Sequence, residues 1–282
     1  MIHLNGELVE EKSAKLSILN RGFQYGDALF ESIRVINNQI MFWETHYFRL
    51  MSSMRILRME IPDFFSPEKL AELIHDVVEA NNYLSQAVKV KINVYRDGKG
   101  LYLPDSKHVG YIISASPISS PFFIKSNSYC EVELFKDHYL NSGLLSTLKT
   151  NNKLTQILAS IFAKENGYDN CLMLNENKSV VEATNGNLFL LKNNKLKTPP
   201  LSDGCLNGII RKQLVEIVGE LDEYEIEEAS ISPFELQKAD ELFYTNAIQG
   251  IVSINKYRKK EFNTEFSTQL IGKLNARARL SD

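Results

Sequence analysis

The sequence predicts a protein of two α+β (α/β) domains, and three observations lead to this prediction. Segments with the strand period of two alternate along the chain with segments of helical period. The 282 residues are enough for two ordinary domains with a substantial buried core. Residues 116–121 read Ser-Pro-Ile-Ser-Ser-Pro, which is the best linker candidate of the chain. We therefore expect an N-terminal α/β domain at 1–116, a linker at 117–124 and a C-terminal domain at 125–282.

In the N-terminal part, turn and cap residues delimit the expected elements. Asn5-Gly6 and Asn37-Asn38 predict two β-hairpins, because these residues tolerate positive φ. Thr45 is the expected cap of a helix that runs to about Leu57, and Ser66-Pro67 opens the next helix. Alternation then predicts two strands, at Val88–Tyr95 and at about Tyr111–Ala115.

In the C-terminal part, short strands and helices follow one another. The expected strands are Tyr129–Phe135, Cys171–Leu174, Val180–Val181, Leu188–Leu191 and Leu242–Tyr244. The expected helices are Leu154–Phe162, one that follows Gly208, and a short one with the capping box Ser232–Glu235.

Composition and charge exclude several classes of protein. The hydrophobic fraction of 44% and the charged fraction of 24% exclude disordered and fibrous classes. The net charge of −3 gives no electrostatic reason to expect a nucleic acid or a membrane as partner. Cys130, Cys171 and Cys205 share no metal-ligand spacing with the histidines, so we expect reduced thiols and no metal site. The chain shows neither a signal-peptide pattern nor an apolar stretch of membrane-spanning length, so we expect a cytoplasmic protein.

Lys149 and Glu182 are the main candidates for chemistry. Lys149 precedes an amphipathic helix, whose positive end disfavours an ammonium and helps to keep the amine nucleophilic. Glu182 follows two valines on a predicted strand. A lysine that forms an imine and an acid that keeps a ring nitrogen protonated are what pyridoxal phosphate (PLP) chemistry requires. Seen alone, each residue also fits a solvated surface position, the lysine near a helix start and the glutamate on an edge strand.

Other residues could hold a phosphate. The backbone amides of Gly208, Ile209 and Ile210 open a helix, where an anion finds free donors. Thr245 and Asn246 follow a strand and could add further donors. Arg49 lies within a predicted helix and could reach the same phosphate, although a solvent-facing arginine explains its position equally well.

Arg34 and Arg96 are the candidates for binding a substrate carboxylate. Arg34 stands between two apolar residues of a strand, where burial is costly unless an anion pairs with it. Arg96 ends a strand at a glycine-bearing loop. Structural ion pairs are the alternative for both arginines.

Several motifs, in order, carry a resemblance to a known family. They are Asn20–Arg34, His46–Leu50, Lys149, Glu182–Phe189, Leu206–Ile209 and Ala239–Phe243. This pattern resembles the fold-type IV PLP enzymes, which include branched-chain aminotransferases, D-amino-acid aminotransferases and aminodeoxychorismate lyases.

The resemblance implies a small N-terminal α/β sandwich and a larger C-terminal pseudo-barrel domain. It implies Lys149 as the Schiff-base lysine, Glu182 as the partner of the pyridine nitrogen, and Arg49 with the amides of residues 208–210 as phosphate ligands. Tyr25 and Phe30 join the two carboxylate-binding arginines as expected substrate contacts. The family further implies a homodimer, with an active site between the domains that a loop of the other subunit closes.

Departures from the family pattern bear on the subclass. Branched-chain aminotransferases usually carry a tyrosine where this chain has Leu154, and many relatives have threonine in place of Ile210. The stretch Phe30–Arg34 is similar to the aminotransferases, and Arg96 resembles the carboxylate-binding arginine of the D-amino-acid type. In contrast, residues 206–209 and 245–247 resemble the lyases.

From this comparison we expect a PLP-dependent aminotransferase that moves an amino group between an amino acid, preferably of the D-type, and a 2-oxo acid. The alternatives are an aminodeoxychorismate lyase that makes 4-aminobenzoate and pyruvate, and a branched-chain L-amino-acid aminotransferase. A non-catalytic binding protein on the same fold is a further alternative, against which Lys149 and Glu182 argue.

Overall fold

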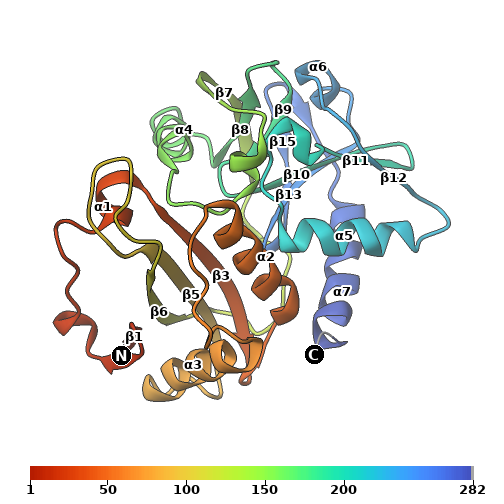
Figure 1. The fold of residues 1–282 in the computed structure, drawn as a ribbon. Coiled ribbons are helices and arrows are strands. Elements are labelled where there is room, and N and C mark those ends of the chain that lie inside the picture. Colours follow the sequence, from red (N-terminus) through yellow and green to blue (C-terminus); the bar gives the residue numbers. More distant parts are fainter. Residues whose placement is uncertain (281–282) are drawn as a thin grey trace. The chain divides into compact units, whose positions relative to one another are not determined.

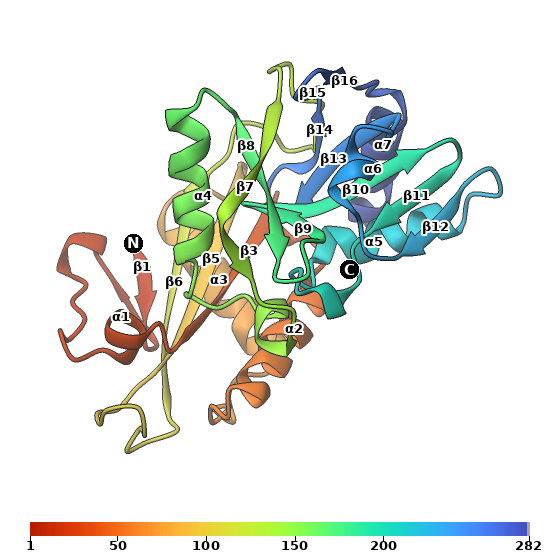
Figure 2. The ribbon, with the colours of Figure 1, turned by 90° about the horizontal axis from the view of Figure 1, so that it is seen from above.

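The computed structural model describes residues 1–280, which fold into two compact units. Of the described residues, unit 1 contains Met1–Pro121, Lys149–Asn152 and 278–280, and unit 2 contains Phe122–Leu148 and Lys153–Arg277. An antiparallel sheet in unit 1 and a mixed sheet in unit 2, each with flanking helices, confirm the predicted α+β fold class (Figures 1 and 2). Unlike the predicted division, unit 1 also includes residues 149–152.

Unit 1 is built on a six-stranded sheet of order β2-β1-β6-β5-β3-β4. Its strands are β1 Ile2–Leu4, β2 Glu7–Val9, β3 Ala28–Ile36, β4 Gln39–Ile40, β5 Ala87–Arg96 and β6 Val109–Pro117. All the strand pairs are antiparallel. The two asparagine-containing turns adopt positive φ as predicted, at Asn5 and Gly6 and at Asn37 and Asn38.

Helices α2 (Trp43–Ile56) and α3 (Pro67–Ala80) pack on this sheet (Figure 1). The other helical elements of unit 1 are η1 Glu11–Ser13 and α1 Arg21–Tyr25. Ser66 caps α3 as predicted, because its side chain accepts a hydrogen bond from Lys69 N at 3.1 Å. The predicted cap of α2 at Thr45 is wrong. The buried Phe42 is the N-cap in a left-handed conformation, so the helix begins three residues earlier than predicted.

Unit 2 contains a ten-stranded sheet that branches at β10, which pairs with β9, β11 and β13. Its strands are β7 Glu131–Leu140, β8 Asn170–Asn175, β9 Val180–Ala183, β10 Gly186–Lys192, β11 Lys195–Thr198, β12 Glu225–Glu228, β13 Glu241–Asn246, β14 Gly250–Ile254, β15 Lys256–Tyr257 and β16 Lys260–Glu261. Residues 170–175 and 180–183 are entirely buried, so β8 and β9 form the centre of this unit.

Helices surround the sheet of unit 2. They are η2 Leu144–Thr147, α4 Leu154–Glu165, η3 Leu201–Asp203, α5 Ile209–Gly219, α6 Pro233–Leu236 and α7 Glu265–Leu280, whose residues 278–280 belong to unit 1. Helix α4 packs on β7 and β8 (Figure 2), and α5 packs on β12 and β13. Helix α6 starts with the predicted capping box of Ser232 and Glu235. Among residues 1–280, no helix has both the length and the apolar character that a membrane crossing requires.

The cap of α3 generates a stability prediction. Replacing Ser66 with alanine should lower the free energy of unfolding by about 1 kcal/mol, because the amide of Lys69 loses its acceptor. Urea unfolding at neutral pH measures this change. The matched control is S52A, because Ser52 is exposed inside α2 and should tolerate alanine without loss. Equal midpoints for S66A and the unchanged protein would contradict the assignment of this cap.

Candidate active site

Lys149 lies at the edge of β3 in unit 1, held there by its backbone. Phe30 N donates a hydrogen bond to Lys149 O at 2.9 Å, and Leu29 and Thr150 form an antiparallel bridge next to it. Opposite residues in such a pairing share a face of the sheet. The side chains of Lys149 and Phe30 therefore lie on one face, and Lys149 Nζ is 4.5 Å from the centroid of the Phe30 ring.

The expected effect of a helix N-terminus on Lys149 is not supported. Helix α4 begins at Leu154 with Lys153 as its N-cap. The field of a helix end falls off within the first turn, and Lys149 precedes that turn by four residues. The lysine is instead a strand-edge residue beside an aromatic ring.

Glu31 forms a buried charged cluster on the opposite face of β3. Its carboxylate accepts hydrogen bonds from Arg49 Nε at 2.7 Å and from Arg49 NH2, which makes the pair bidentate. His46 Nδ1 lies 2.7 Å from Oε2, the carboxylate oxygen that also accepts from Arg49 NH2. Burial alone would raise the pKa of Glu31, but the charges and hydrogen bonds of Arg49 and His46 outweigh it and lower the pKa to about 2. Glu31 is thus an anion fixed between two helix residues.

The same cluster sets the protonation of His46. An ionised carboxylate can only accept, so Nδ1 must carry the hydrogen that it donates to Glu31. Burial lowers the pKa of His46 below its ordinary value, and the charges of Arg49 and Lys149 lower it further, against the raising effect of Glu31. His46 is thus a hydrogen-bond donor to Glu31 in a buried position that disfavours its charged form.

Arg49 is the residue for which the sequence predicted a phosphate contact. The structure shows that Glu31 takes two of its donors. A guanidinium has five N–H donors, so this pair fixes the direction of the group without using all of them. The contact between Arg49 and a phosphate remains a prediction.

Arg34 lies on the same face of β3 as Phe30, because the two residues are four positions apart in an extended strand. Its side chain is buried. Its NH2 group donates a hydrogen bond to Ser120 O. Burial lowers the pKa of its guanidinium to about 10. Its role in binding a carboxylate also remains a prediction.

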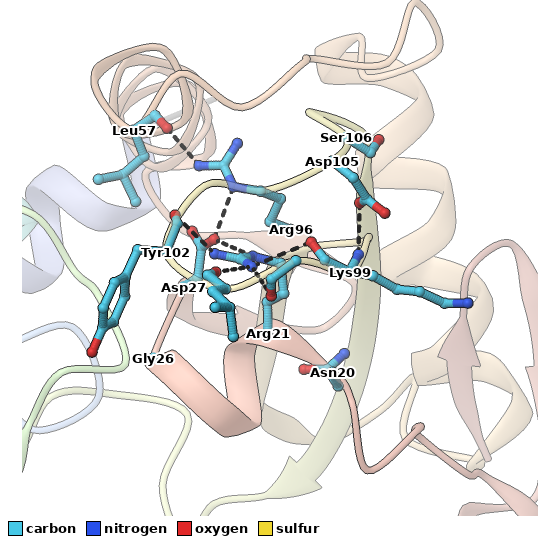
Figure 3. A network of polar contacts seen from close by, with 12 residues as sticks. Asn20, Arg21, Gly26, Asp27, Leu57, Arg96, Lys99, Tyr102, Asp105 and Ser106 are labelled. Carbon is cyan, nitrogen blue, oxygen red and sulfur yellow. Dashed lines mark hydrogen bonds and ion pairs between the residues drawn. The ribbon is translucent and has the colours of Figure 1, made fainter.

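Arg96 belongs to a structural network of ion pairs and hydrogen bonds. This is the alternative to carboxylate binding that the sequence left open. Its Nε donates to Asp27 Oδ2 at 2.8 Å, and its NH2 donates to Leu57 O at 2.6 Å. Arg21 binds the same carboxylate oxygen of Asp27 at 3.0 Å, and its NH1 donates to Leu101 O in the loop that follows β5. Figure 3 shows the two guanidinium groups converging on Asp27. This geometry favours a role of Arg96 in holding the loop over one in binding substrate.

Tyr25, a predicted substrate contact, belongs to the same region. It ends α1, and its ring lies 6.0 Å from the ring of Tyr102 and 4.9 Å from the guanidinium carbon of Arg21. The structure thus places Tyr25 against the loop of residues 97–108, whereas Phe30 lies against Lys149.

Glu182 is the first member of a polar row in unit 2. Strands β9, β10 and β13 are neighbours, and the register places Glu182 opposite Asn187 and Asn187 opposite Thr245. Directly opposite residues share a face, so these three side chains form one row across the sheet. All three are buried. The alternative of an edge-strand glutamate facing water is therefore wrong.

The segment before α5 covers this row. Leu206 N donates to Glu182 Oε2 at 3.0 Å, and Asn187 Nδ2 donates to Leu206 O at 2.7 Å. At Gly208, a Cβ atom would lie 1.9 Å from Asn187 Oδ1, so only glycine permits this approach. The amide of Gly208 donates to Leu206 O at 2.8 Å. The N-cap of α5 is Gly208, which has no side chain that could cap the first helical amides. The amides of Ile209 and Ile210 are therefore the better anion donors.

Thr245 and Asn246 differ in whether their side chains are available to bind a ligand. The Oγ1 of Thr245 is buried and has no hydrogen-bond partner within residues 1–280. A buried hydroxyl without a partner is costly, which suggests that a ligand completes it. Asn246, in contrast, uses its side chain in the turn to β14, where Oδ1 accepts from Gln249 N at 2.8 Å.

Comparison with known proteins gives the family. Residues 28–257 match the family described as Amino-transferase class IV. The chain belongs to this family. It is 29% identical over 273 residues to a putative branched-chain-amino-acid aminotransferase of Methanocaldococcus jannaschii, which covers 97% of this chain and 93% of that protein. It is 25% identical over 260 residues to an aminodeoxychorismate lyase of Vibrio harveyi, with 92% of each protein covered.

A solved structure agrees with this result. The branched-chain amino acid aminotransferase of Thermobaculum terrenum, solved in its PLP form, superposes with a TM-score of 0.86 and 25% identity over 100% of this chain and 94% of that chain. The resemblance that the sequence motifs carried is confirmed, as is the expectation of a class IV enzyme. The similar proteins include both aminotransferases and lyases, so they do not decide between the two reactions.

Several residues of the site had been given no role from the sequence. Glu31 and His46 hold Arg49, and Asn187 links Glu182 to the segment before α5. The sequence does contain a pattern that predicts burial of Glu31. The strand period of two places Glu31 on the same face as the apolar residues Leu29 and Ile33. A carboxylate at such a position needs a buried partner.

The Glu31 cluster generates a prediction about stability and pH. Replacing Glu31 with glutamine should lower the free energy of unfolding at pH 7 by about 3 kcal/mol, because Arg49 keeps a buried charge without its counterion. The pKa of Glu31 is lower in the folded protein, so its contribution is present above pH 4.5 and is lost as the pH falls toward 2. E31Q should therefore show a weaker pH dependence of stability in this window.

Guanidinium unfolding at pH 7 and pH 3 measures both effects. The matched control is E72Q, because Glu72 pairs with Lys69 on the exposed surface of α3 and should contribute at most about 0.5 kcal/mol. A loss in E31Q no greater than that in E72Q would refute the buried-pair interpretation.

Proposed function

We propose that this protein is a PLP-dependent aminotransferase that moves an amino group between an amino acid and a 2-oxo acid. The polar row of unit 2 carries the proposal. It places the acid Glu182, the buried hydroxyl of Thr245 and the uncapped start of α5 around one surface. PLP presents a protonatable ring nitrogen and a phosphate, and these groups require an acid and a set of neutral donors. The residues of unit 2 fit both requirements.

The protein residues would perform distinct tasks. Bound PLP supplies an electron sink for the bond that is broken at the amino-acid carbon. Lys149 would attach the cofactor through Nζ and, once released, carry a proton to and from the substrate carbon. Glu182 would keep the ring nitrogen protonated, and Thr245 with the amides of Ile209 and Ile210 would bind the phosphate.

The substrate is a finer part of the proposal. The resemblance of Arg96 supports a D-amino-acid substrate, but Asp27 and Leu57 O already engage this guanidinium. We therefore assign carboxylate recognition to Arg34 and retain the D-type as the substrate to test first. Elimination from aminodeoxychorismate is the second candidate, because residues 245–247 resemble the lyases and the Vibrio relative carries that name. Branched-chain L-amino acids are the third candidate.

One assay separates these candidates. The PLP-loaded protein is mixed separately with D-alanine, L-leucine and aminodeoxychorismate. Conversion of the cofactor to its amino form by D-alanine or L-leucine supports transamination and shows the preferred chirality. Release of pyruvate and 4-aminobenzoate without that conversion would overturn the aminotransferase in favour of the lyase.

The oligomeric state and location belong to the same proposal. We infer a homodimer in the cytoplasm from the family resemblance. Sedimentation velocity at micromolar concentration should give twice the chain mass of 32.2 kDa.

The role of Lys149 generates a prediction. Lys149→Ala should abolish the visible absorption of lysine-bound PLP and lower turnover by at least a thousandfold, because neither attachment nor proton transfer by Nζ remains. The matched control is K153A, which removes the lysine that caps α4 and should keep the absorption band. A normal band in K149A would assign the attachment to another lysine.

Thr245 gives a second prediction with two readouts. Thr245→Val should leave the PLP-free protein as stable or up to about 1 kcal/mol more stable, because it removes a buried hydroxyl without a partner. The dissociation constant of PLP should rise roughly tenfold, because a phosphate hydrogen bond is lost.

The matched control for T245V is Thr198→Val. Thr198 is also buried, but its Oγ1 donates to Leu188 O at 2.8 Å. T198V should therefore lose stability while keeping its affinity for PLP. Unchanged PLP affinity in T245V would remove Thr245 from the phosphate site.

A further inference from the structure

The aromatic ring of Phe30 contacts the amine of Lys149. Its centroid lies 4.5 Å from Lys149 Nζ, which is within the range of a cation–π interaction. Phe30 and Lys149 are both only partly buried, whereas Leu29 and Ile33, on the other face of β3, are buried. Phe30 therefore does not belong to the apolar core that Leu29 and Ile33 join.

The backbone fixes the two residues opposite each other. The bridge between Leu29 and Thr150 makes Phe30 and Lys149 directly opposite residues, and Phe30 N donates to Lys149 O at 2.9 Å. The Cβ atoms of directly opposite residues are about 5 Å apart. The strand pairing thus sets where the lysine side chain begins. The stem of a lysine is flexible, so the position of Nζ needs a further contact, which the ring supplies.

A second ammonium group reaches the same ring. Lys91 Nζ is 4.8 Å from the centroid. The register places Asn93 of β5 opposite Phe30, and Lys91 precedes Asn93 by two positions, so Lys91 is a diagonal neighbour of the ring. A nearby like charge disfavours the ammonium form of Lys149, and the negative face of the ring favours it. The ring thus offsets part of the repulsion between the two lysines.

The proposed chemistry changes the charge of Lys149 during each cycle. The inference rests on the proposed function, because it takes Lys149 as the proton carrier. When the released amine takes the proton of the substrate carbon, its lone pair forms the new N–H bond and the amine becomes an ammonium. The electron pair of the broken C–H bond passes to bound PLP. A cation–π interaction acts on the ammonium form, so the contact with Phe30 is strongest while Lys149 holds the proton.

We propose that Phe30 is a positioning residue for the reaction, whose ring holds Lys149 Nζ while the lysine carries the substrate proton. The proton must be delivered again within the same cycle, and its transfer requires the reacting atoms to be close and aligned. An ammonium on a flexible stem would turn toward water, where its charge is best solvated. The ring offers the charge a partner beside the strand pairing instead.

The alternative is a packing role, in which the ring only covers the apolar stems of the two lysines. Lysine stems commonly lie along apolar surface while their heads stay in water. A leucine at position 30 would serve such a role, because it is apolar, but it has no π face. A tyrosine keeps the π face. The comparison of F30L with F30Y therefore distinguishes positioning from packing.

Competitive labelling of the full chain without PLP tests the contact directly. The fraction of Lys149 that acetic anhydride labels is followed against pH by mass spectrometry. Its midpoint reports the pH at which the ammonium loses its proton, and it does not depend on how accessible the amine is. In F30L the midpoint should fall by about 0.5 pH unit, because the ring no longer stabilises the ammonium. In F30Y it should stay unchanged.

Other charges near Lys149 are the same in all these variants. They are Lys91 on β5 and the Glu31 cluster, whose His46 senses the charge of Lys149. Lys69 on the exposed surface of α3 is the internal reference, and its midpoint should not move in any variant. An equal midpoint of Lys149 in F30L and in the unchanged protein would overturn the proposal.

Kinetics of the PLP-loaded protein give the second readout. The substrate is the amino acid that the half-reaction assay selects, with deuterium at the reacting carbon for comparison. F30L should lower kcat about tenfold and raise the kinetic isotope effect, because proton transfer becomes slower relative to the other steps. The affinity for PLP should stay unchanged, and F30Y should behave as the unchanged protein. A rise of KM alone, without a change in kcat or in the isotope effect, would assign Phe30 to substrate binding and overturn the proposal.

The control variant is F64L. Phe64 is an exposed phenylalanine whose ring packs against Phe65 and Tyr111. F64L should keep the labelling midpoint of Lys149, kcat and the isotope effect.

Failure of the proposed function has a different signature. An unchanged protein that never develops the absorption band of lysine-bound PLP fails as an aminotransferase, whatever the labelling shows. A normal band together with an unmoved midpoint in F30L overturns the role of Phe30 alone.

Discussion

The short backbone pairing between β3 and residues 149–151 is the constraint on which the proposed role of Lys149 depends. It makes the lysine part of the sheet edge, and it places the Lys149 side chain beside Phe30. Backbone hydrogen bonds of this kind are formed by any sequence. The strand pairing therefore fixes the position of residue 149 but does not restrict which side chain stands there.

The register of β3 is in turn fixed from its other face. A shift by one residue would expose Glu31, Leu29 and Ile33 and bury Phe30 and Ser32 in their place. The bidentate pair with Arg49 and the contact with His46 oppose such a shift, because a buried carboxylate is costly without its partners. One charged cluster thus holds both α2 and the strand that positions Lys149.

Local signals made much of the fold predictable, and tertiary contacts account for what was missed. The turn at Asn37-Asn38 and the caps at Ser66 and Ser232 follow from single residues, and the structure bears them out. The start of α2 was misplaced because the left-handed Phe42 depends on burial, which Thr45 does not reveal. Helix α7 was not identified, although Phe266, Leu270 and Leu274 follow the helical period.

For the candidate site, motifs singled out Lys149 and Glu182. The pairing of Arg96 with Asp27 and the row through Asn187 required the strand register, which no local pattern encodes.

The phosphate-binding region that we propose in unit 2 has a physical character that suits its task. The donors of unit 2 are backbone amides and a buried hydroxyl, which are fixed before the ligand arrives and lose little entropy on binding. Such a site suits a cofactor that stays bound through many turnovers.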